Sequence, residues 1–423
     1  MQVGILLFAG NLYFFWYLQM LNMNFIWLYM TDNFEYVRDS LINDIETLKS
    51  KDGFLYAGFP RFMELFGRDS LISSMELSYL YPQILKNTLI ALSKKQGTQY
   101  NNNTGEEPGK ILHEIAEKNS FKNNANKEEW VKSGIPMYYS IDSTLLFIIA
   151  CEFYLIEYSD IEFLNSIKVS LENAIKWLLN KSEKNEFLTY NITETQGKLA
   201  SQGWMDGAWE VYNGLSGDIA LIEIQGYMYE ALEKYNKLFP ENLFYNQIED
   251  KLHFLKKNLD KYFWMGEENY YSPAISINDG KKERIQLITS NAGHLLFTGL
   301  LERVKKESIV KRIFEDDMMT PYGIRTLSSH SSKFNPCQYQ SGSIWPNDNW
   351  MILKGLKSSG FTKEADLLRS HLIDAIITLK NPYEYYSVDI DDNIINPDNL
   401  INKPCSPQAW TVGAFLSILD DKF

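Results

Sequence analysis

Residues 246–263, NQIEDKLHFLKKNLDKYF, carry apolar side chains at steps of three and four. An α-helix with 3.6 residues per turn places such positions on one face, and here the charged residues fall on the other face. The apolar face comprises Ile248, Leu252, Leu255, Leu259 and Tyr262. Residues 163–181, FLNSIKVSLENAIKWLLNK, repeat this pattern. Both stretches predict amphipathic helices that cover a core.

The same pattern recurs along most of the chain. Helices are expected near residues 34–50, 71–95, 142–158, 218–237, 289–303, 307–315, 348–358, 362–379 and 407–419. Strand signals are few, chiefly FLTYNIT at residues 187–193. About a dozen helices of ordinary length predict an all-α fold, either a toroid of helical hairpins or an irregular bundle. A chain of 423 residues can form one large domain or two ordinary ones.

Composition narrows the class of partner. The net charge of −13 argues against nucleic acid, because phosphate binding needs clustered Lys and Arg. The 26 tyrosines and 10 tryptophans suit sugar binding or large cores. Three cysteines lie far apart and five histidines form no ligand motif, so neither a metal nor another cofactor is expected. Cysteines this widely spaced fit a reducing compartment, and a cytoplasmic location is expected.

Residues 1–31 contain no charged side chain, and the run VGILLFAGNLYFFWYLQM is long enough to span a bilayer. Four amide side chains interrupt the segment, at Asn11, Gln19, Asn22 and Asn24, and no Lys or Arg precedes it. A segment packed against the main domain is therefore favoured over a membrane anchor. The expected organisation is this segment at 1–31 followed by a domain at 32–423.

One loop places a carboxylate among large apolar side chains. In SQGWMDGAWE, residues 201–210, Asp206 lies between two tryptophans and follows a methionine. Apolar surroundings disfavour the charged form, raise the pKa and let a carboxyl hold a proton near neutral pH. Alternatively, Asp206 caps the helix that follows. These ten residues alone leave both interpretations open.

Several other loops combine glycine, aromatic and charged residues, as functional loops do. They are AGFPRFMELFGRDSLI (57–72), EEPGKILHEI (106–115), YYSIDSTLLF (138–147), PYGIRTLSS (321–329), YQSGSIWPNDN (339–349) and NPYEYYSVD (381–389). By contrast, the polar stretch at about 100–130 is either a lid or plain surface.

Three further runs belong with these loops: IEIQGYMYEAL (222–232), TSNAGHLLFTG (289–299) and CSPQAWTVGA (405–414). Read in order, the loops and these runs resemble the amylo-α-1,6-glucosidases, which are debranching glucosidases related in fold to glucoamylases. The resemblance implies an (α/α)6 toroid of six helical hairpins, with a site formed by loops at one end. The chain departs from the family motifs at Met205, where many relatives have lysine, and at Gln340, where relatives often have histidine.

The resemblance also implies two catalytic carboxylates. Glycoside hydrolysis needs a proton for the leaving oxygen and a second carboxylate at the anomeric side. Asp206 is similar to the family's general acid, with Glu210 as its rival. Glu384 in PYEYY stands near the family's general base, and Asp389 is another possible carrier. Glu223 also matches a family position, with either a catalytic or a structural role.

The Arg68–Asp69 pair is similar to the pair that grips the terminal glucose in glucoamylase-like enzymes. A guanidinium fork and a carboxylate can bind neighbouring hydroxyl groups, although such a pair can also simply close a loop. Trp204 and Trp345 are expected either to present flat faces to a sugar ring or to pack in the core. Weaker candidates for lining the same pocket are Arg325, Asp142, Lys110, His113 and Glu114.

The leading expectation is an exo-acting, inverting α-glucosidase that cuts α-1,6 branches of glycogen-like glucans. Alternatives are glucoamylase or trehalase activity and an inactive glucan-binding paralogue. The toroid fold also hosts sugar epimerases and polysaccharide lyases, so fold alone does not settle function.

Overall fold

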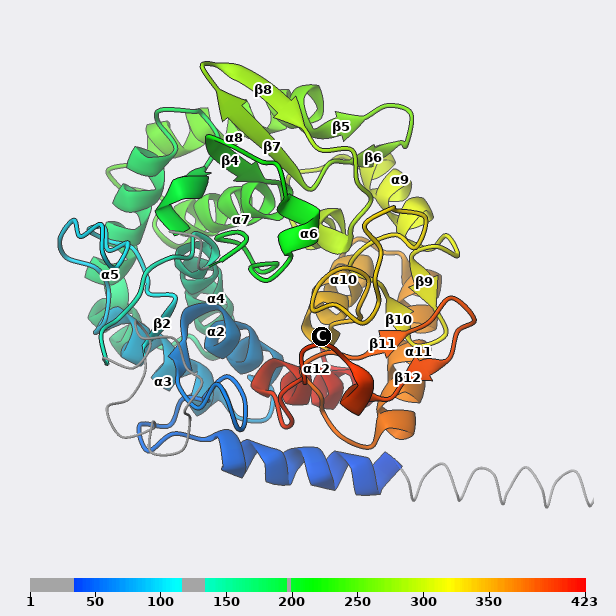
Figure 1. Ribbon diagram of the computed structural model, residues 1–423. Coiled ribbons are helices and arrows are strands. Elements are labelled where there is room, and N and C mark those ends of the chain that lie inside the picture. The colour runs from blue at the N-terminus through cyan, green and yellow to red at the C-terminus, as the bar shows by residue number, and fades with distance from the viewer. Residues whose placement is uncertain (1–33, 116–133, 196–198) are drawn as a thin grey trace, which may run out of the picture.

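The structure is a computed structural model that describes residues 34–115, 134–195 and 199–423. Helices in this part of the chain alternate between an outer and an inner ring (Figure 1). The inner ring consists of α2 (Gly67–Glu76), α4 (Asp142–Tyr158), α7 (Ile222–Leu238), the 3₁₀ helix η2 (Ser290–Phe297), α10 (Pro346–Ser358) and α12 (Ala409–Leu419). The outer ring consists of the helix at 34–48, α3 (Pro82–Ser93), α5 (Ile161–Lys181), α8 (Tyr245–Phe263), α9 (Arg303–Ile313) and α11 (Thr362–Leu379).

The inner ring closes on itself. Each inner helix packs against the next, and α12 packs against α2, so the two ends of the chain's helical part meet. The outer helix at 34–48 also contacts the chain just after α12, because Arg38 donates to both carboxylate oxygens of Asp420, at 2.7 and 2.9 Å. The expected all-α toroid of six helical hairpins is the observed fold.

The sequence pattern explains which helix takes which ring. In α8, Ile248, Leu252, Leu255 and Leu259 are buried as predicted, while its polar face is exposed. By contrast, all 11 residues of α12 are buried. A helix surrounded by neighbours on every side must be apolar or small all round, whereas an outer helix needs only one such stripe.

Short strands lie in the connections between helices. An antiparallel sheet with the order β3-β4-β7-β8 is the largest, and the others are two-stranded pairs β1-β2, β5-β6, β10-β9 and β11-β12. The strand bounds are β1 Leu65–Phe66, β2 Glu114–Ile115, β3 Tyr190–Asn191, β4 Asp218–Leu221, β5 Trp264–Met265, β6 Tyr270–Tyr271, β7 Ala274–Asn278, β8 Lys281–Arg284, β9 Met319–Thr320, β10 Gly323–Ile324, β11 Ser387–Val388 and β12 Ile394–Ile395. Three short helices complete the described part of the chain: η1 (Ile192–Thr195), α6 (Trp209–Tyr212) and η3 (Pro397–Asn399).

Three predicted helices differ most from the structure, and one of them, at 289–303, is the 3₁₀ helix η2, which ends at Phe297. The stretch at 71–95 is not one helix: α2 ends at Glu76 and α3 begins at Pro82, which has no N–H to donate and fits only a first helical turn. The stretch at 218–237 begins as strand β4, because residues 218–221 pair with β7. At 71–95 and at 218–237 apolar periodicity continues across a change of backbone structure.

The predictions for the segment at 1–31 and for most of the polar stretch at about 100–130 concern residues outside the described part of the chain. Within the described residues, no helix combines the length and the hydropathy that a membrane span requires.

Candidate functional site

Alternation of outer and inner helices makes the six inner helices parallel, so their N-terminal ends meet at one end of the toroid. The first turns there carry the buried carboxylates of Asp69 on α2, Asp142 on α4, Glu223 on α7 and Asp348 on α10. The N-terminus of a helix has partial positive charge and unpaired N–H groups, which favour negative side chains. This end of the ring therefore concentrates acidic groups without unfolding the core.

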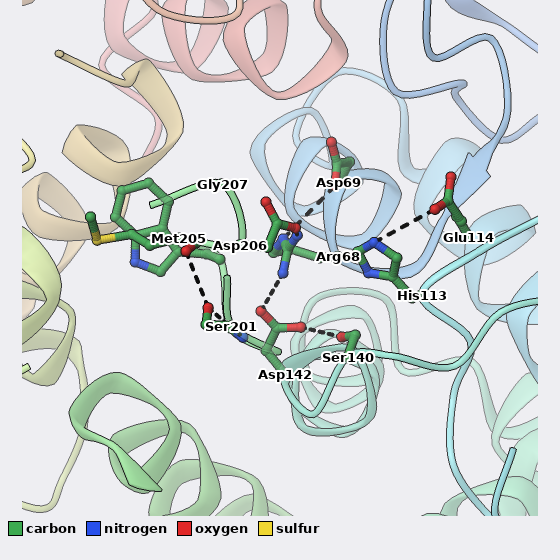
Figure 2. A network of polar contacts seen from close by, with 12 residues as sticks. Arg68, Asp69, His113, Glu114, Ser140, Asp142, Ser201, Met205, Asp206 and Gly207 are labelled. Atoms are coloured by element: carbon green, nitrogen blue, oxygen red, sulfur yellow. Dashed lines mark hydrogen bonds and ion pairs between the residues drawn. The ribbon is translucent and has the colours of Figure 1, made fainter. Parts of the chain in front are cut away.

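Arg68 lies at the centre of an acidic cluster that consists of Asp69, Asp142 and Asp206 (Figure 2). Its guanidinium donates to Asp142 Oδ2 at 2.7 Å and to Asp206 Oδ2, and its Nε lies 3.9 Å from Asp69 Oδ2. Asp142 also accepts from the hydroxyl of Ser140. Only 3% of Arg68 is exposed, and the three carboxylates raise the pKa of its guanidinium against the opposing effect of burial.

One buried guanidinium faces three carboxyl groups, so the cluster favours retention of a proton. Burial, together with the charges of Asp206 and Glu384 and against the opposing charge of Arg68, raises the pKa of Asp69 to about 7. Burial likewise raises the pKa of Asp206, with Arg68 again opposing. The acidic end of the ring can thus hold protons at neutral pH.

Asp206 is held at the surface of this cluster by its neighbours. Trp204 and Met205 are buried, whereas the Asp206 side chain is 18% exposed. The main chain closes the loop, with Ala200 N–H donating to the Asp206 carbonyl at 2.7 Å and Ser201 Oγ donating to the Met205 carbonyl at 3.1 Å. Helix α6 begins three residues later without a side-chain cap, so the alternative that Asp206 caps this helix is wrong.

Glu384 lies in the loop before β11 and is 1% exposed. Its Oε1 accepts from the Tyr339 hydroxyl, and its Oε2 accepts from Arg61 at 3.1 Å and from the Cys405 N–H at 3.0 Å. Burial and the charge of Asp206 raise its pKa, while these three donors act in the opposite direction. Three donors stabilise the ionised carboxylate, which is the form that can accept a proton.

Tyr339 links the two candidate catalytic carboxyls. Its ring packs against Gly207, where an added Cβ would come within 2.5 Å of Tyr339 Cδ1, and its hydroxyl reaches Glu384. The next residue, Gln340, accepts from the Gly207 N–H and donates to the Trp204 carbonyl, both at 2.9 Å. The loop at 339–340 therefore joins the Asp206 loop to Glu384, so both carboxyls belong to the same end of the toroid.

The weaker candidates divide into two groups. His113 lies beside Arg68, and Glu114 lies beyond His113 (Figure 2), with His113 Nε2 3.9 Å from Glu114 Oε1. Burial and the charges of Arg68 and Lys110 hold the pKa of His113 well below its usual value, so its ring is neutral. Lys110 instead pairs with Glu107 at 3.6 Å and lies over a tryptophan ring, which gives it a structural environment.

Three residues that the sequence predicts to bind sugar make contacts within the protein instead. Trp204 and Trp345 are 2% and 1% exposed, Trp204 stacked on His294 and Trp345 stacked on Tyr385, so the structure favours core packing over a face open to sugar. Arg325 donates to the carbonyls of Val388 and Asp389 and so fastens the β11–β12 hairpin rather than lining the acidic cluster. Tryptophan and arginine suit cores as well as sites, and their sequence context does not separate the two.

The other carboxylates considered for catalysis, Glu210, Asp389 and Glu223, each have different neighbours. Glu210 accepts from Ser341 Oγ at 3.1 Å. Asp389 accepts from the N–H groups of Asp391 and Asn393, both at 2.9 Å, which closes the β11–β12 turn. Glu223 is fully buried beside Gly203, and burial raises its pKa to about 8.

Sequence reasoning did not single out Arg61, Tyr339 or Gln408. Arg61 and Tyr339 bind Glu384, and Gln408 Nε2 donates to Asp69 Oδ1 at 3.3 Å. Arg61 and Tyr339 lie in the loops that mix glycine with aromatic and charged residues, which is the signal that could have identified them, and Gln408 lies in the run CSPQAWTVGA, which carries no such mixture. Among the described residues, no group of three His, Cys, Asp or Glu side chains could hold a metal ion.

Solved structures share this fold. A GH63 mannosylglycerate hydrolase from Thermus thermophilus, in complex with Tris and D-glycerate, aligns with a TM-score of 0.69 at 13% identity over 91% of this chain and 100% of that chain. The same hydrolase in complex with glucose gives 0.67 at 13% identity over 91% and 99%. A wild-type glycosidase gives 0.62 at 11% identity over 92% and 97%.

Sequence comparison identifies the family. No curated protein is significantly similar in sequence. The family model described as amylo-alpha-1,6-glucosidase, however, matches residues 126–417, which is more than half of the chain. The chain therefore belongs to the amylo-α-1,6-glucosidase family and is a glycoside hydrolase.

Proposed function

We propose that this hydrolase releases glucose from α-glucans, at the α-1,6 branch points of glycogen-like chains. The observation that carries the proposal is the contrast between two carboxyls at one end of the toroid. Burial raises the pKa of both carboxyls, but Asp206 is partly exposed and bonded by Arg68, whereas three donors hold the buried Glu384 and favour its ionised form. Glycoside hydrolysis needs one carboxyl that donates a proton and one carboxylate that accepts one.

In the proposed reaction Asp206 donates its proton to the glycosidic oxygen as the bond to the anomeric carbon breaks. Glu384 takes a proton from a water molecule that attacks the anomeric carbon from the opposite face. The products are glucose with inverted configuration and the shortened glucan, after which Asp206 regains a proton from solvent and Glu384 releases one to solvent. Arg68 and Asp69 are proposed to bind hydroxyl groups of the terminal glucose, through guanidinium donors and carboxylate acceptors.

Arg61 supports this division of roles. Its side chain is 39% exposed and its guanidinium bonds the buried Glu384. It therefore favours the ionised form of the proposed base and also faces solvent, where it can donate to a substrate hydroxyl. We further propose that residues 32–423 act as one catalytic domain and that the protein works in the cytoplasm.

Product analysis on a panel of substrates tests the proposed function. Glucose release would be measured from a branched limit dextrin, isomaltose, maltose and trehalose, and mannose release from mannosylglycerate. The proposal expects the highest kcat/KM on the branched dextrin, with loss of that activity in Asp206→Asn and Glu384→Gln. Preference for maltose, trehalose or mannosylglycerate would contradict the proposed substrate while leaving the hydrolase assignment in place.

A further inference from the structure

A cavity lies toward the end of the inner ring that is opposite the acidic first turns. It has a volume of about 470 Å³ and is lined by residues of α2, α4, α7, η2 and α10 together with Phe423. On α2, α4, α7 and α10 its lining begins two to seven residues after the acidic residue of the first turn and continues toward the C-terminal end. Lys354 follows Asp348 by six residues, roughly 9 Å at 1.5 Å per residue. The volume falls in the range of roughly 300–1,000 Å³ that small-molecule sites occupy.

The charges that line this cavity are mostly positive. Three lysines, Lys234, Lys354 and Lys357, and one carboxylate, Glu230, contribute to the wall, although the whole chain has a net charge of −13. Lys234 is neutralised by Glu152 at 2.5 Å and Glu230 at 3.4 Å.

Lys357 is also paired. It lies 3.4 Å from Asp366 and 3.7 Å from Asp421. Two of the three lysines thus have carboxylate partners.

Lys354 differs from the other two. Within the described residues its ammonium has no ion pair or hydrogen bond, and it lies 4.9 Å from the ring centre of Phe153 and 5.4 Å from that of Trp350. The side chain is partly buried, and burial together with the charge of Lys234 lowers its pKa to about 8, against the opposing charges of Glu230 and Glu152. A partly buried ammonium without a directly bonded carboxylate is costly, and an anion in the cavity would offset that cost.

The rest of the wall is apolar, formed by aromatic, methionine and aliphatic side chains that include Met75, Leu146, Ile149, Phe297 and Met351. We propose that this cavity binds a small organic carboxylate with an apolar or ring-shaped body, whose carboxylate meets Lys354. Such a ligand satisfies the ammonium and fills the apolar space, whereas a compact hydrated anion satisfies only the ammonium.

Benzoate is a suitable probe, and isothermal titration calorimetry on the full chain measures its binding. Saturable benzoate binding is expected, at least tenfold tighter than binding of neutral benzamide or of inorganic phosphate. Lys354→Met, which keeps the length and apolar stem of the side chain, should weaken benzoate binding at least tenfold. Lys363→Met on the exposed surface of α11 is the matched control and should leave the affinity unchanged.

The pH dependence of the unmodified chain gives a second test that needs no variant. Because the Lys354 ammonium is lost as pH rises through about 8, benzoate affinity should fall between pH 7 and pH 9.5. Absence of saturable benzoate binding, equal binding of phosphate, full affinity in Lys354→Met, or affinity constant across this pH range would each overturn the proposal. None of these outcomes depends on glucosidase activity, so they leave the proposed function untouched.

Discussion

Asp206 shows how a single carboxyl obtains its proposed role from its surroundings. Trp204 and Met205 anchor the loop in the core, the Asp206 side chain stays partly exposed, and Arg68 holds one of its oxygens. Burial raises the pKa of this carboxyl and Arg68 limits the rise. The outcome is an acid that is protonated more readily than an ordinary aspartic acid and is fixed in position.

Replacement of this carboxyl gives the first prediction. Asp206→Asn should lower kcat on a branched dextrin by about 10²–10⁴-fold, because a positioned acid contributes roughly that factor. With α-glucosyl fluoride, whose leaving group needs no proton, most of the activity should return. Glu210→Gln is the matched control and should retain activity on both substrates. Equal losses on dextrin and fluoride would contradict the role of Asp206 as an acid.

Tyr339 gives a second prediction at this scale. Its hydroxyl donates to Glu384, and this bond favours the ionised carboxylate. Tyr339→Phe should raise the pKa of Glu384 and move the acidic limb of kcat/KM to higher pH, because the base must be ionised to act. Tyr385→Phe is the control, since the Tyr385 hydroxyl donates to the Asn402 carbonyl instead. An unshifted acidic limb in Tyr339→Phe would argue against this assignment.

At the scale of elements, the order of helices was predictable and several of their limits were not. Apolar steps of three and four identify α8 and α5 because an outer helix has one buried face. The break between α2 and α3 was missed, although Pro82 marks it, because apolar residues continue through the turn. The β7–β8 hairpin was missed because its second strand, KKER, is polar and mostly exposed.

The same reasoning explains which site residues were predictable. The Arg68, Asp206 and Glu384 loops were identified by their mix of residue types and by family resemblance. The partners of Glu384 lie far away in sequence, 323 residues for Arg61 and 45 for Tyr339, so only the folded ring brings them together. Burial of Trp204 and Trp345 likewise depends on aromatic neighbours from other loops.

Arg325 supplies the prediction for an element. It fastens the β11–β12 hairpin, which follows Glu384 directly. Arg325→Met should remove two charge-assisted hydrogen bonds and lower the free energy of unfolding by about 2 kcal/mol. Hydrogen exchange at residues 387–395 should accelerate most. Arg303→Met, whose ion pair with Glu307 is exposed, is the control, and equal acceleration of the hairpin in both variants would contradict the clamp.

For the whole molecule, six parallel inner helices collect buried acids at one end, and this has a consequence for stability. Burial raises the pKa of Glu223 to about 8, whereas a glutamate in the unfolded chain titrates near 4.5. The folded state therefore binds this proton more tightly, and unfolding releases it between these two pH values. The contribution of Glu223 to stability is largest below about pH 4.5 and is lost as pH rises toward 8.

Glu223→Gln, which mimics the protonated form, should therefore raise Tm at pH 8 relative to the unmodified chain and change it little at pH 5. The exposed Glu241→Gln is the control and should show no such difference between the two pH values. Thermal unfolding followed by circular dichroism measures both. A Tm that drops at pH 8 in Glu223→Gln would mean that the ionised carboxylate stabilises the ring.

The central claim is that Asp206 and Glu384 act from opposite faces of one sugar as acid and base. Such a pair activates a water molecule and inverts the anomeric centre, which requires carboxyls about 6.5–9.5 Å apart rather than the roughly 5–5.5 Å of a retaining pair. Proton NMR of the first glucose released from a branched limit dextrin, recorded before mutarotation, tests this directly. β-Glucose is expected first, because water attacks opposite the leaving group, and α-glucose appearing first would rule out an inverting pair.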